Sequence, residues 1–248
     1  MRVLLLGGTT EANQIGRSLA AAGVAGVYSY AGRTATPVPQ PLPTRVGGFG
    51  GVDGLVEYIR QEHITHVIDA THPFANQISR NAVEACAKTS RPLIACLREP
   101  WRETPGDKWQ HVATVEDAAA ILPARPARIF LAIGRQHLAP FAAQSQHFYL
   151  LRLIDAPDTP LPLPDTEIVL ARGPFTIEGD LALLRDHRIT HVVTRNAGGE
   201  GARAKLDAAR GLGLPVIMID RPDLPERKVA QSVEQIVRWL THSACLGV

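Results

Sequence analysis

Several loops of this chain combine glycine with polar residues in the way that anion-binding loops do. The first, Gly7-Gly8-Thr9-Thr10-Glu11, follows a short apolar run and precedes a helical pattern. The glycines would bring backbone N–H groups close to an anion, the threonine hydroxyls add donors, and the positive end of the following helix points to the same place. The loop therefore predicts binding of a nucleotide phosphate. A tight turn with only a structural role would also explain the two glycines.

The run "SYAGRT" at residues 29–34 indicates which nucleotide is preferred. NAD-binding units place a carboxylate near this position, where it accepts hydrogen bonds from the ribose hydroxyls. This run contains no acidic residue. Arg33, with Ser29 and Thr34, could instead bind a 2′-phosphate, because an arginine fork pairs well with a phosphate dianion. The run predicts NADPH rather than NADH as the cofactor, with a solvated loop arginine as the alternative.

Two further loops of the first half could contact a ligand. The run "RVGGFGG" at residues 45–51 surrounds Phe49 and Gly50 with glycines. It is either a mobile lid that lets a flat ligand lie against the backbone or a plain flexible loop. In "DATHPFA", Pro73 holds His72 in an extended conformation. His72 could donate a proton or bind a cofactor ribose or a substrate carboxylate, and a merely solvated histidine is the alternative.

Cations recur in the loops of the second half, near the ends of predicted strands. Together they would suit a ligand with several carboxylates, because arginine forks bind carboxylates well. Taken one at a time, each could also be an ordinary surface residue. Arg152, near another strand end, is a similar candidate. The candidates in these loops are Arg135, Gln136, Arg172, Gly173, Asn196, Gly198, Gly199 and Lys205.

Alternating strand and helix patterns must position these loops. Residues 3–6 of the run "RVLLL" are continuously apolar, as expected for a parallel strand covered on both faces, and residues 11–22 follow as a helix. The alternation continues to a predicted final helix at 228–240. Strands separated by helices indicate parallel crossovers, and such sheets bind ligands at the carboxyl ends of their strands, where these loops fall. The sequence predicts an α/β fold with two Rossmann-like parallel-sheet domains and a ligand cleft between them.

The domain boundary is predicted near residue 125, where Pro123 and Pro126 bracket a break. It gives an NADPH-binding domain at 1–124 and a domain on the substrate side of the cleft at 125–248. The segments "HITHVIDA" and "RITHVVTR" resemble each other. They suggest that the two halves are related α/β units, although a match this short could arise by chance.

Composition excludes several classes of partner. The 248 residues include 26 Lys and Arg against 24 Asp and Glu, which favours neither nucleic acid nor a membrane as a partner. No apolar run approaches the length of a membrane span, and no signal-peptide pattern opens the chain. The three cysteines lack C-x-x-C spacing, which indicates a reduced, cytoplasmic protein without a structural zinc site. No cluster of metal ligands is evident, so we expect no metal.

The loops in their order along the chain resemble the precorrin-6A reductase family of cobalamin biosynthesis. The motifs that carry the resemblance are "LLLGGTTEA", "AGRTATP", "RVGGFGG", "IDATHPFA", "REPWRETPGDKW", "AIGRQ", "ARGPF" and "RNAGGEGARAKLDAA". The resemblance implies two Rossmann-like domains and NADPH-dependent reduction of one double bond of precorrin-6A to give precorrin-6B.

The resemblance also implies roles for the loops. Residues 7–11 would hold the pyrophosphate, and Ser29, Arg33 and Thr34 the adenosine phosphate. The loops at Phe49, Arg135, Arg172 and Asn196 would face the tetrapyrrole. The reduction also needs a proton, which water or His72 could supply. Hand-over contacts with neighbouring enzymes of the pathway are a further expectation. Two alternatives are an NADPH-dependent reductase of another anionic substrate and a non-catalytic NADP(H)-sensing module.

Overall fold

The apolar run that begins at Val3 lies in β1 (Arg2–Leu6), a central strand of a six-stranded parallel sheet. The strand order is β12-β5-β4-β1-β2-β3, which is the order of a Rossmann sheet read from its sixth strand to its third. The chain changes direction across the sheet between β1 and β4, where Rossmann sheets bind their ligands. The other strands are β2 (Ala25–Tyr30), β3 (Thr44–Val46), β4 (His66–Asp69), β5 (Leu93–Cys96) and β12 (Lys228–Ala230).

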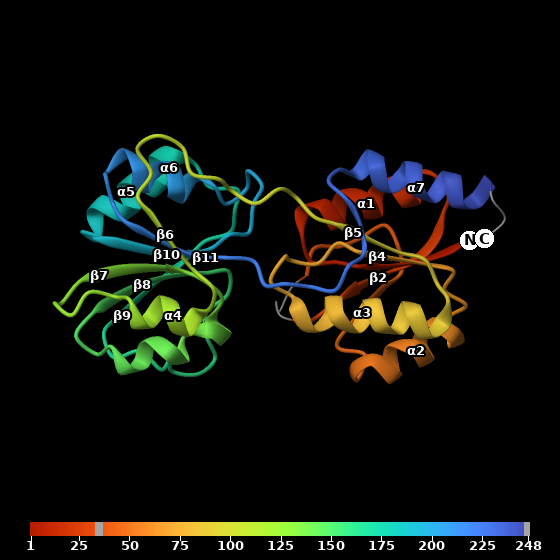
Figure 1. The fold of residues 1–248 in the computed structure, drawn as a ribbon, viewed down its shortest axis with the longest axis horizontal. Helices are drawn as coiled ribbons and strands as arrows, with labels where there is room; N and C mark the ends of the chain where they lie inside the picture. The colour runs from red at the N-terminus through yellow and green to blue at the C-terminus, as the bar shows by residue number, and fades with distance from the viewer. Residues whose placement is uncertain (33–36, 246–248) are drawn as a thin grey trace. The chain divides into compact units, whose positions relative to one another are not determined.

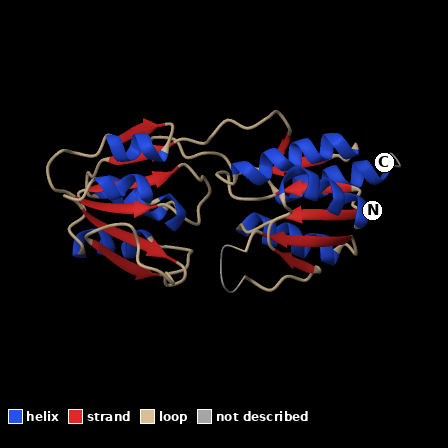
Figure 2. Cartoon of the chain, turned by 90° about the horizontal axis from the view of Figure 1, so that it is seen from below, coloured by secondary structure: helices blue, strands red, loops and turns tan. Residues whose placement is uncertain are grey.

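Helices cover both faces of this sheet (Figure 1), and Figure 2 shows its strands side by side. The helices α1 (Thr10–Ala21) and α7 (Val233–Cys245) lie on one face, and α2 (Gly51–Gln61) and α3 (Asn76–Thr89) on the other. Alternate residues of β1 enter the two cores: Val3 and Leu5 pack with α1 and α7, while Leu4 and Leu6 pack with α2 and α3. This double burial is why the run is continuously apolar.

A second parallel sheet has the order β6-β11-β10-β7-β8-β9. It repeats the Rossmann order if β6 takes the sixth position, so its ligand-binding switch point lies between β7 and β10. Helices α5 (Ile177–Asp186) and α6 (Ala204–Gly211) cover one face, and α4 (Val115–Ala120) lies on the other (Figure 1). The strands are β6 (Trp109–Val112), β7 (Arg128–Ala132), β8 (Phe148–Leu153), β9 (Thr166–Leu170), β10 (His191–Arg195) and β11 (Val216–Ile219). Two short 3₁₀ helices follow β7, at Arg135–His137 and Ala139–Ala143.

The predicted fold class is confirmed, but the chain divides at other places than residue 125. The computed structural model describes residues 1–32 and 37–245, and it separates Met1–Glu99 with Pro222–Val248 from Pro100–Arg221. The reason lies in the edge strands. Strand β6 precedes β7 and yet pairs with β11, and β12 follows the second unit and yet pairs with β5. The predicted domains 1–124 and 125–248 assign both edge strands to the wrong sheet.

The repeated "ITHV" segments occupy equivalent places in the two sheets. They lead into β4 and β10, which pair with β1 and β7, the strands that hold the first position of the Rossmann order in their sheets. In the first sheet the Thr65 hydroxyl accepts from the Arg2 N–H at 2.9 Å and donates to the Arg2 carbonyl at 3.0 Å. Thr190 makes the same two bonds with Arg128, both at 3.1 Å. The two halves therefore share a local hydrogen-bond pattern as well as a strand order.

The ends of the helices follow the sequence signals in part. Thr114 caps α4 in a capping box with Asp117, as the sequence predicts. The predicted final helix at 228–240 is partly wrong, because Lys228–Ala230 pairs with β5 as β12 and α7 begins only at Val233. No helix within the described residues is long and apolar enough to cross a membrane.

Three histidines make the stability of both units sensitive to acid. Burial lowers the pKa of His66, His147 and His191 below the usual 6.5. Because the unfolded chain binds these protons more readily, their contribution to stability is complete above about pH 6.5 and is lost as the pH falls through the lowered values. We expect the free energy of unfolding to decrease from pH 7.5 to pH 5, by at most about 1.4 kcal/mol per pH unit per histidine.

Urea denaturation at several pH values checks this expectation. The variant His147→Gln should reduce the pH dependence, because His147 is 1 % exposed and its Nδ1 accepts from the Ala127 N–H at 3.1 Å. The exposed His242 lies outside both cores, so His242→Gln is the matched control and should leave the pH dependence unchanged. A free energy of unfolding that is flat between pH 7.5 and pH 5 would contradict the expectation.

Candidate functional site

The glycine turn after β1 is built around the buried Tyr28. The Gly7 N–H donates to the Ser29 carbonyl at 3.0 Å, and the Gly8 N–H donates to the Tyr28 hydroxyl at 3.0 Å. A Cβ on Gly7 would lie 2.3 Å from the Tyr28 ring, whereas one on Gly8 would meet nothing within 4 Å. Gly8 has a φ of +113°, which a side chain rarely tolerates. The turn thus combines one crowded glycine with one that leaves an open approach to the backbone.

Thr9 and Thr10 lie where the turn becomes α1. The Thr9 hydroxyl accepts from the Ala12 N–H at 3.1 Å as the helix cap and donates to the Ala70 carbonyl at 2.8 Å. Thr10 is the first residue of the helix. The N–H groups at the start of a helix lack partners within it, so this end carries partial positive charge. The N–H groups of the two glycines already have partners, which leaves the first turn of α1 as the source of donors that an anion at this turn would need.

Glu11 forms an ion pair that the sequence does not reveal. Arg98, just after β5, places Nη1 at 3.2 Å from one carboxylate oxygen of Glu11 and 3.3 Å from the other. The two side chains are only 22 % and 27 % exposed. This pairing neutralises an acidic group that would otherwise repel an anion at the start of α1. Arg98 is a residue that the sequence interpretation missed, because 87 positions separate the partners.

The loop after β4 is held by a buried carboxylate. Asp69 is 1 % exposed and accepts from the Thr71 hydroxyl at 2.7 Å and from the Ser79 hydroxyl at 2.6 Å. Within this loop, His72 Nδ1 accepts from the Phe74 N–H at 3.2 Å. This bond fixes the orientation of the imidazole ring within the loop. The role of His72 as a proton donor or orienting group stays a prediction.

The end of β2 carries Ser29, which is 5 % exposed. Its hydroxyl accepts from Arg45 Nη1 at 2.8 Å. Arg45 is an additional residue of this region that the sequence interpretation missed. The predicted partners Arg33 and Thr34 lie outside the described residues. Phe49 packs edge-on against Tyr58, and Gly50 precedes α2 in a left-handed conformation.

Two predicted loops of the second unit expose their cations. Arg135 and Gln136 lie in the 3₁₀ turn after β7, at the switch point of this sheet, and both are exposed. Arg172 and Gly173 are exposed after β9. Neither arginine forms an ion pair within the part of the chain that the structure describes. Both can therefore reach a carboxylate of a ligand without first breaking an internal pair.

Arg152 does not belong with these exposed cations. It forms an ion pair with Asp180 of α5, and its guanidinium lies 3.5 Å from the centre of the Phe175 ring. The side chains of Arg152 and Asp180 are only 10 % and 3 % exposed. The expectation that Arg152 binds a ligand is wrong, because its guanidinium already pairs with Asp180 and stacks on Phe175.

The loop after β10 is fastened to Trp101. The Asn196 side chain accepts from the Trp101 N–H at 2.7 Å and donates to the Trp101 carbonyl at 3.0 Å. The indole N–H donates to the Gly199 carbonyl at 2.7 Å. Lys205 is 4 % exposed, donates to the Ala202 carbonyl and lies 4.6 Å from the indole ring centre. These contacts give Asn196 and Lys205 a supporting role. Substrate contact by them and by Gly198 stays a prediction.

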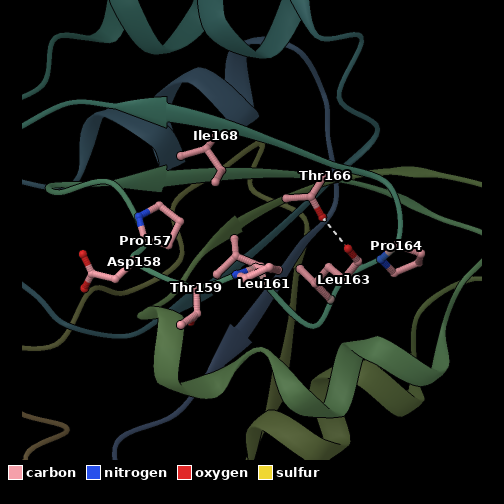
Figure 3. A pocket seen from close by; sticks show the side chains of 9 residues that line it. Pro157, Asp158, Thr159, Leu161, Leu163, Pro164, Thr166 and Ile168 are labelled. Carbon is pink, nitrogen blue, oxygen red and sulfur yellow. Dashed lines mark hydrogen bonds between the residues drawn. The ribbon is translucent and has the colours of Figure 1, made fainter.

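A pocket of about 500 Å³ lies elsewhere in the second unit (Figure 3). It is between the edge strand β9 and the proline-rich segment at residues 157–164, which connects β8 to β9. Asp158 is its one acidic group, and Thr166 donates to the Leu163 carbonyl at 3.4 Å across one end. No predicted site residue lines it, and it offers no cation to a carboxylate ligand. The full lining is Pro157, Asp158, Thr159, Pro160, Leu161, Leu163, Pro164, Thr166 and Ile168.

The strand order and the turn after β1 place the first unit in the class of Rossmann-like dinucleotide-binding folds. Residues 2–241 match the family described as precorrin-6x reductase CbiJ/CobK. A precorrin-6A reductase of Rhodobacter capsulatus is 60 % identical over 239 residues, covering 96 % of this chain and 95 % of the relative. One from Sinorhizobium sp is 45 % identical over 244 residues, covering 96 % and 94 %.

A solved structure titled CobK precorrin-6A reductase superposes with a TM-score of 0.94 at 59 % identity, covering 98 % of this chain and 96 % of that one. The chain therefore belongs to the precorrin-6x reductase family. It is an oxidoreductase of cobalamin biosynthesis. The resemblance found in the ordered loops is confirmed.

Proposed function

We propose that this chain reduces a macrocycle double bond of precorrin-6A with NADPH, giving precorrin-6B. One observation carries the proposal: a precorrin-6A reductase is 60 % identical over nearly the whole of both chains. Both Rossmann-like units fall within the matched residues, so the activity is not transferred from a fragment. The cofactor and the residue roles are argued below from the geometry of each unit.

NADPH fits the first unit by the shape and charge of its turn. The open space above Gly8 admits a pyrophosphate against the backbone, and the N–H groups at Thr10 and Glu11 would bind it. Arg98 holds the Glu11 carboxylate so that it does not repel the phosphates. The 2′-phosphate would lie near Ser29, Arg33 and Thr34. When bound, NADPH supplies the hydride, while the protein supplies orientation and electrostatics.

The substrate is a tetrapyrrole precursor rimmed with carboxylates. Arg135 and Arg172 would bind those carboxylates, because both are exposed and neither forms an ion pair among the described residues. Gln136 and Gly173 belong to the same two loops. The backbone of the Asn196 loop, including Gly198 and Gly199, would add N–H donors. His72 would orient a substrate group or pass on a proton.

A cytoplasmic location completes the proposal. Cys86 and Cys96 are buried free thiols, as expected in a reducing compartment. Precorrin intermediates would then pass between this enzyme and its pathway neighbours by direct hand-over contacts. Co-purification of the chain with the enzymes that make precorrin-6A and use precorrin-6B would test that part separately.

The decisive experiment mixes the purified chain with precorrin-6A and either NADPH or NADH, and follows absorbance at the nicotinamide band. We expect NADPH to be consumed only when precorrin-6A is present, together with formation of the two-electron-reduced macrocycle. Binding of NADPH without its oxidation would favour the NADP(H)-sensing module. Oxidation of NADPH with a different anionic substrate, and not with precorrin-6A, would favour a reductase of that other substrate.

Arg33→Ala tests the cofactor assignment directly. The variant should weaken NADPH binding by about 10- to 100-fold and change NADH binding less than 2-fold, because only NADPH carries the 2′-phosphate that a charged donor would bind. Fluorescence titration with each nucleotide measures the two affinities. Arg17→Ala, on the exposed face of α1, is the control for loss of one positive charge. Equal losses for both nucleotides would remove Arg33 from the 2′-phosphate site.

A further inference from the structure

We propose that Arg45 binds the 2′-phosphate of NADPH and that the glycine-rich loop at 47–50 belongs to the nucleotide site. The inference rests on the proposed function, because it presumes that this unit binds a phosphorylated dinucleotide. It adds a specificity-determining residue to that site. It also moves Phe49 and Gly50 from the predicted tetrapyrrole contacts to the support of the cofactor.

The position of Arg45 follows from the register of the sheet. Arg45 of β3 pairs with Ser29 of β2, and the Ser29 carbonyl in turn accepts from Gly7 of the turn after β1. Adjacent strands lie about 4.8 Å apart, so β3 lies about 10 Å from β1 across the sheet. A ribose attached to a pyrophosphate at the Gly7 turn would extend over β2 toward Arg45, as in Rossmann sheets.

The guanidinium is held in place by neutral groups. Nη1 donates to the Ser29 hydroxyl at 2.8 Å and to the Gly47 carbonyl at 2.9 Å, and Nη2 donates to the Gly48 carbonyl at 2.9 Å. Its central carbon lies 3.8 Å from the centre of the Phe49 ring. An arginine has five N–H donors, so two remain, one on Nε and one on Nη2. The protein thus fixes the fork and leaves two donors for a ligand.

The charge of Arg45 has no carboxylate partner within the residues that the structure describes. The acidic residue in the first turn of α2, Asp53, pairs with Lys88 at 3.4 Å instead. Burial lowers the pKa of the Arg45 guanidinium, because desolvation disfavours its charged form. A half-buried cation that is rigidly oriented and lacks a counter-ion gains strongly from an anion that accepts its remaining N–H groups. A phosphate dianion meets both requirements.

The test compares fragments that differ only in the 2′-phosphate. Calorimetry with adenosine 2′,5′-bisphosphate and with 5′-AMP should show that Arg45→Gln weakens the first by about 10- to 100-fold and the second less than 2-fold. Arg45→Lys should fall between the wild type and Arg45→Gln, because an ammonium keeps the charge but cannot form a fork. Arg60→Gln, which removes the same charge from an exposed position on α2, should leave both affinities unchanged.

Each outcome decides the inference. Equal weakening of both fragments by Arg45→Gln would overturn it and assign Arg45 to loop structure alone. Unchanged fragment binding with a raised KM for precorrin-6A would overturn it in favour of the macrocycle. If thermal melting shows that Arg45→Gln does not fold, Arg45→Lys decides the question through the ratio of its affinities for the two fragments. A wild type that binds both fragments equally would defeat the NADPH proposal itself, whereas a preference that survives in both variants would defeat only the role of Arg45.

Discussion

Replacing Gly7 by alanine is expected to disable the turn after β1. The new Cβ would lie 2.3 Å from the ring of Tyr28, which is fully buried and whose hydroxyl donates to Asn13 at 2.8 Å. The ring cannot move without breaking that bond and the bond from the Gly8 N–H. We expect a loss of about 1–3 kcal/mol in the free energy of unfolding. NADPH affinity should fall by about 100-fold, because several N–H donors shift together.

Urea denaturation and calorimetric titration of NADPH measure the two effects of Gly7→Ala. Gly48→Ala is the matched control for the stability measurement in the same unit, because its Cβ would meet nothing within 4 Å and its φ is not positive. That control should change the free energy of unfolding by less than about 0.5 kcal/mol. If Gly7→Ala retains both its stability and its NADPH affinity, the turn does not depend on its contact with Tyr28.

Removing the carboxylate of Asp180 should have the largest effect on the second unit. Asp180→Ala would leave the Arg152 guanidinium buried against Phe175 without its counter-charge. Breaking a buried pair at one partner typically costs about 3–5 kcal/mol, because the remaining charge is no longer compensated. Thermal and urea unfolding should report this loss. NADPH binding should be unaffected in any molecules that remain folded, because Asp180 belongs to the other unit.

An exposed ion pair provides the comparison for Asp180→Ala. Glu62→Ala breaks the pair with Arg2, whose partners are 41 % and 39 % exposed, and should cost less than about 1 kcal/mol. Replacing both buried partners, as Arg152→Met with Asp180→Leu, should recover much of the stability that Asp180→Ala loses. Similar effects for Asp180→Ala and Glu62→Ala would show that Arg152 finds another partner or reaches water.

Under the proposed function, the two sheets would bind two ligands of different chemistry. Both have the Rossmann strand order, and both place their loops at the carboxyl ends of strands. The first unit uses backbone N–H groups and a helix end, which suit phosphates. The second presents the exposed cations Arg135 and Arg172, which suit carboxylates. A related fold thus carries different side chains in its loops.

Local patterns were sufficient for much of the fold. The apolar run at β1, the two glycines and the helical stripe of α1 lie within about twenty residues and agree with one another. The Thr114 cap is equally local, since its partner Asp117 is three residues away. Such signals depend only on neighbouring residues and on strand or helix geometry. The fold class and the family could therefore be assigned from the sequence.

The edge strands and the supporting contacts of the site depend on residues far apart in the sequence. The local sequence of Lys228–Ala230 predicts a helix, but pairing with β5 makes this segment a strand. Arg98 and Glu11 are 87 positions apart, and Asn196 and Trp101 are 95 apart. A sequence pattern contains no information on which of many distant partners such side chains will contact.

What the sequence determined by itself was the alternation of strands and helices, the fold class and the family to which the chain belongs. Only the tertiary structure decided what each arginine does. Arg152 pairs with Asp180, and Arg98 pairs with Glu11. Arg45 instead donates to neutral acceptors and has no carboxylate partner among the described residues. The physical reason is that a guanidinium has the same chemistry at every position, so its role depends on burial and on the charges that folding brings beside it.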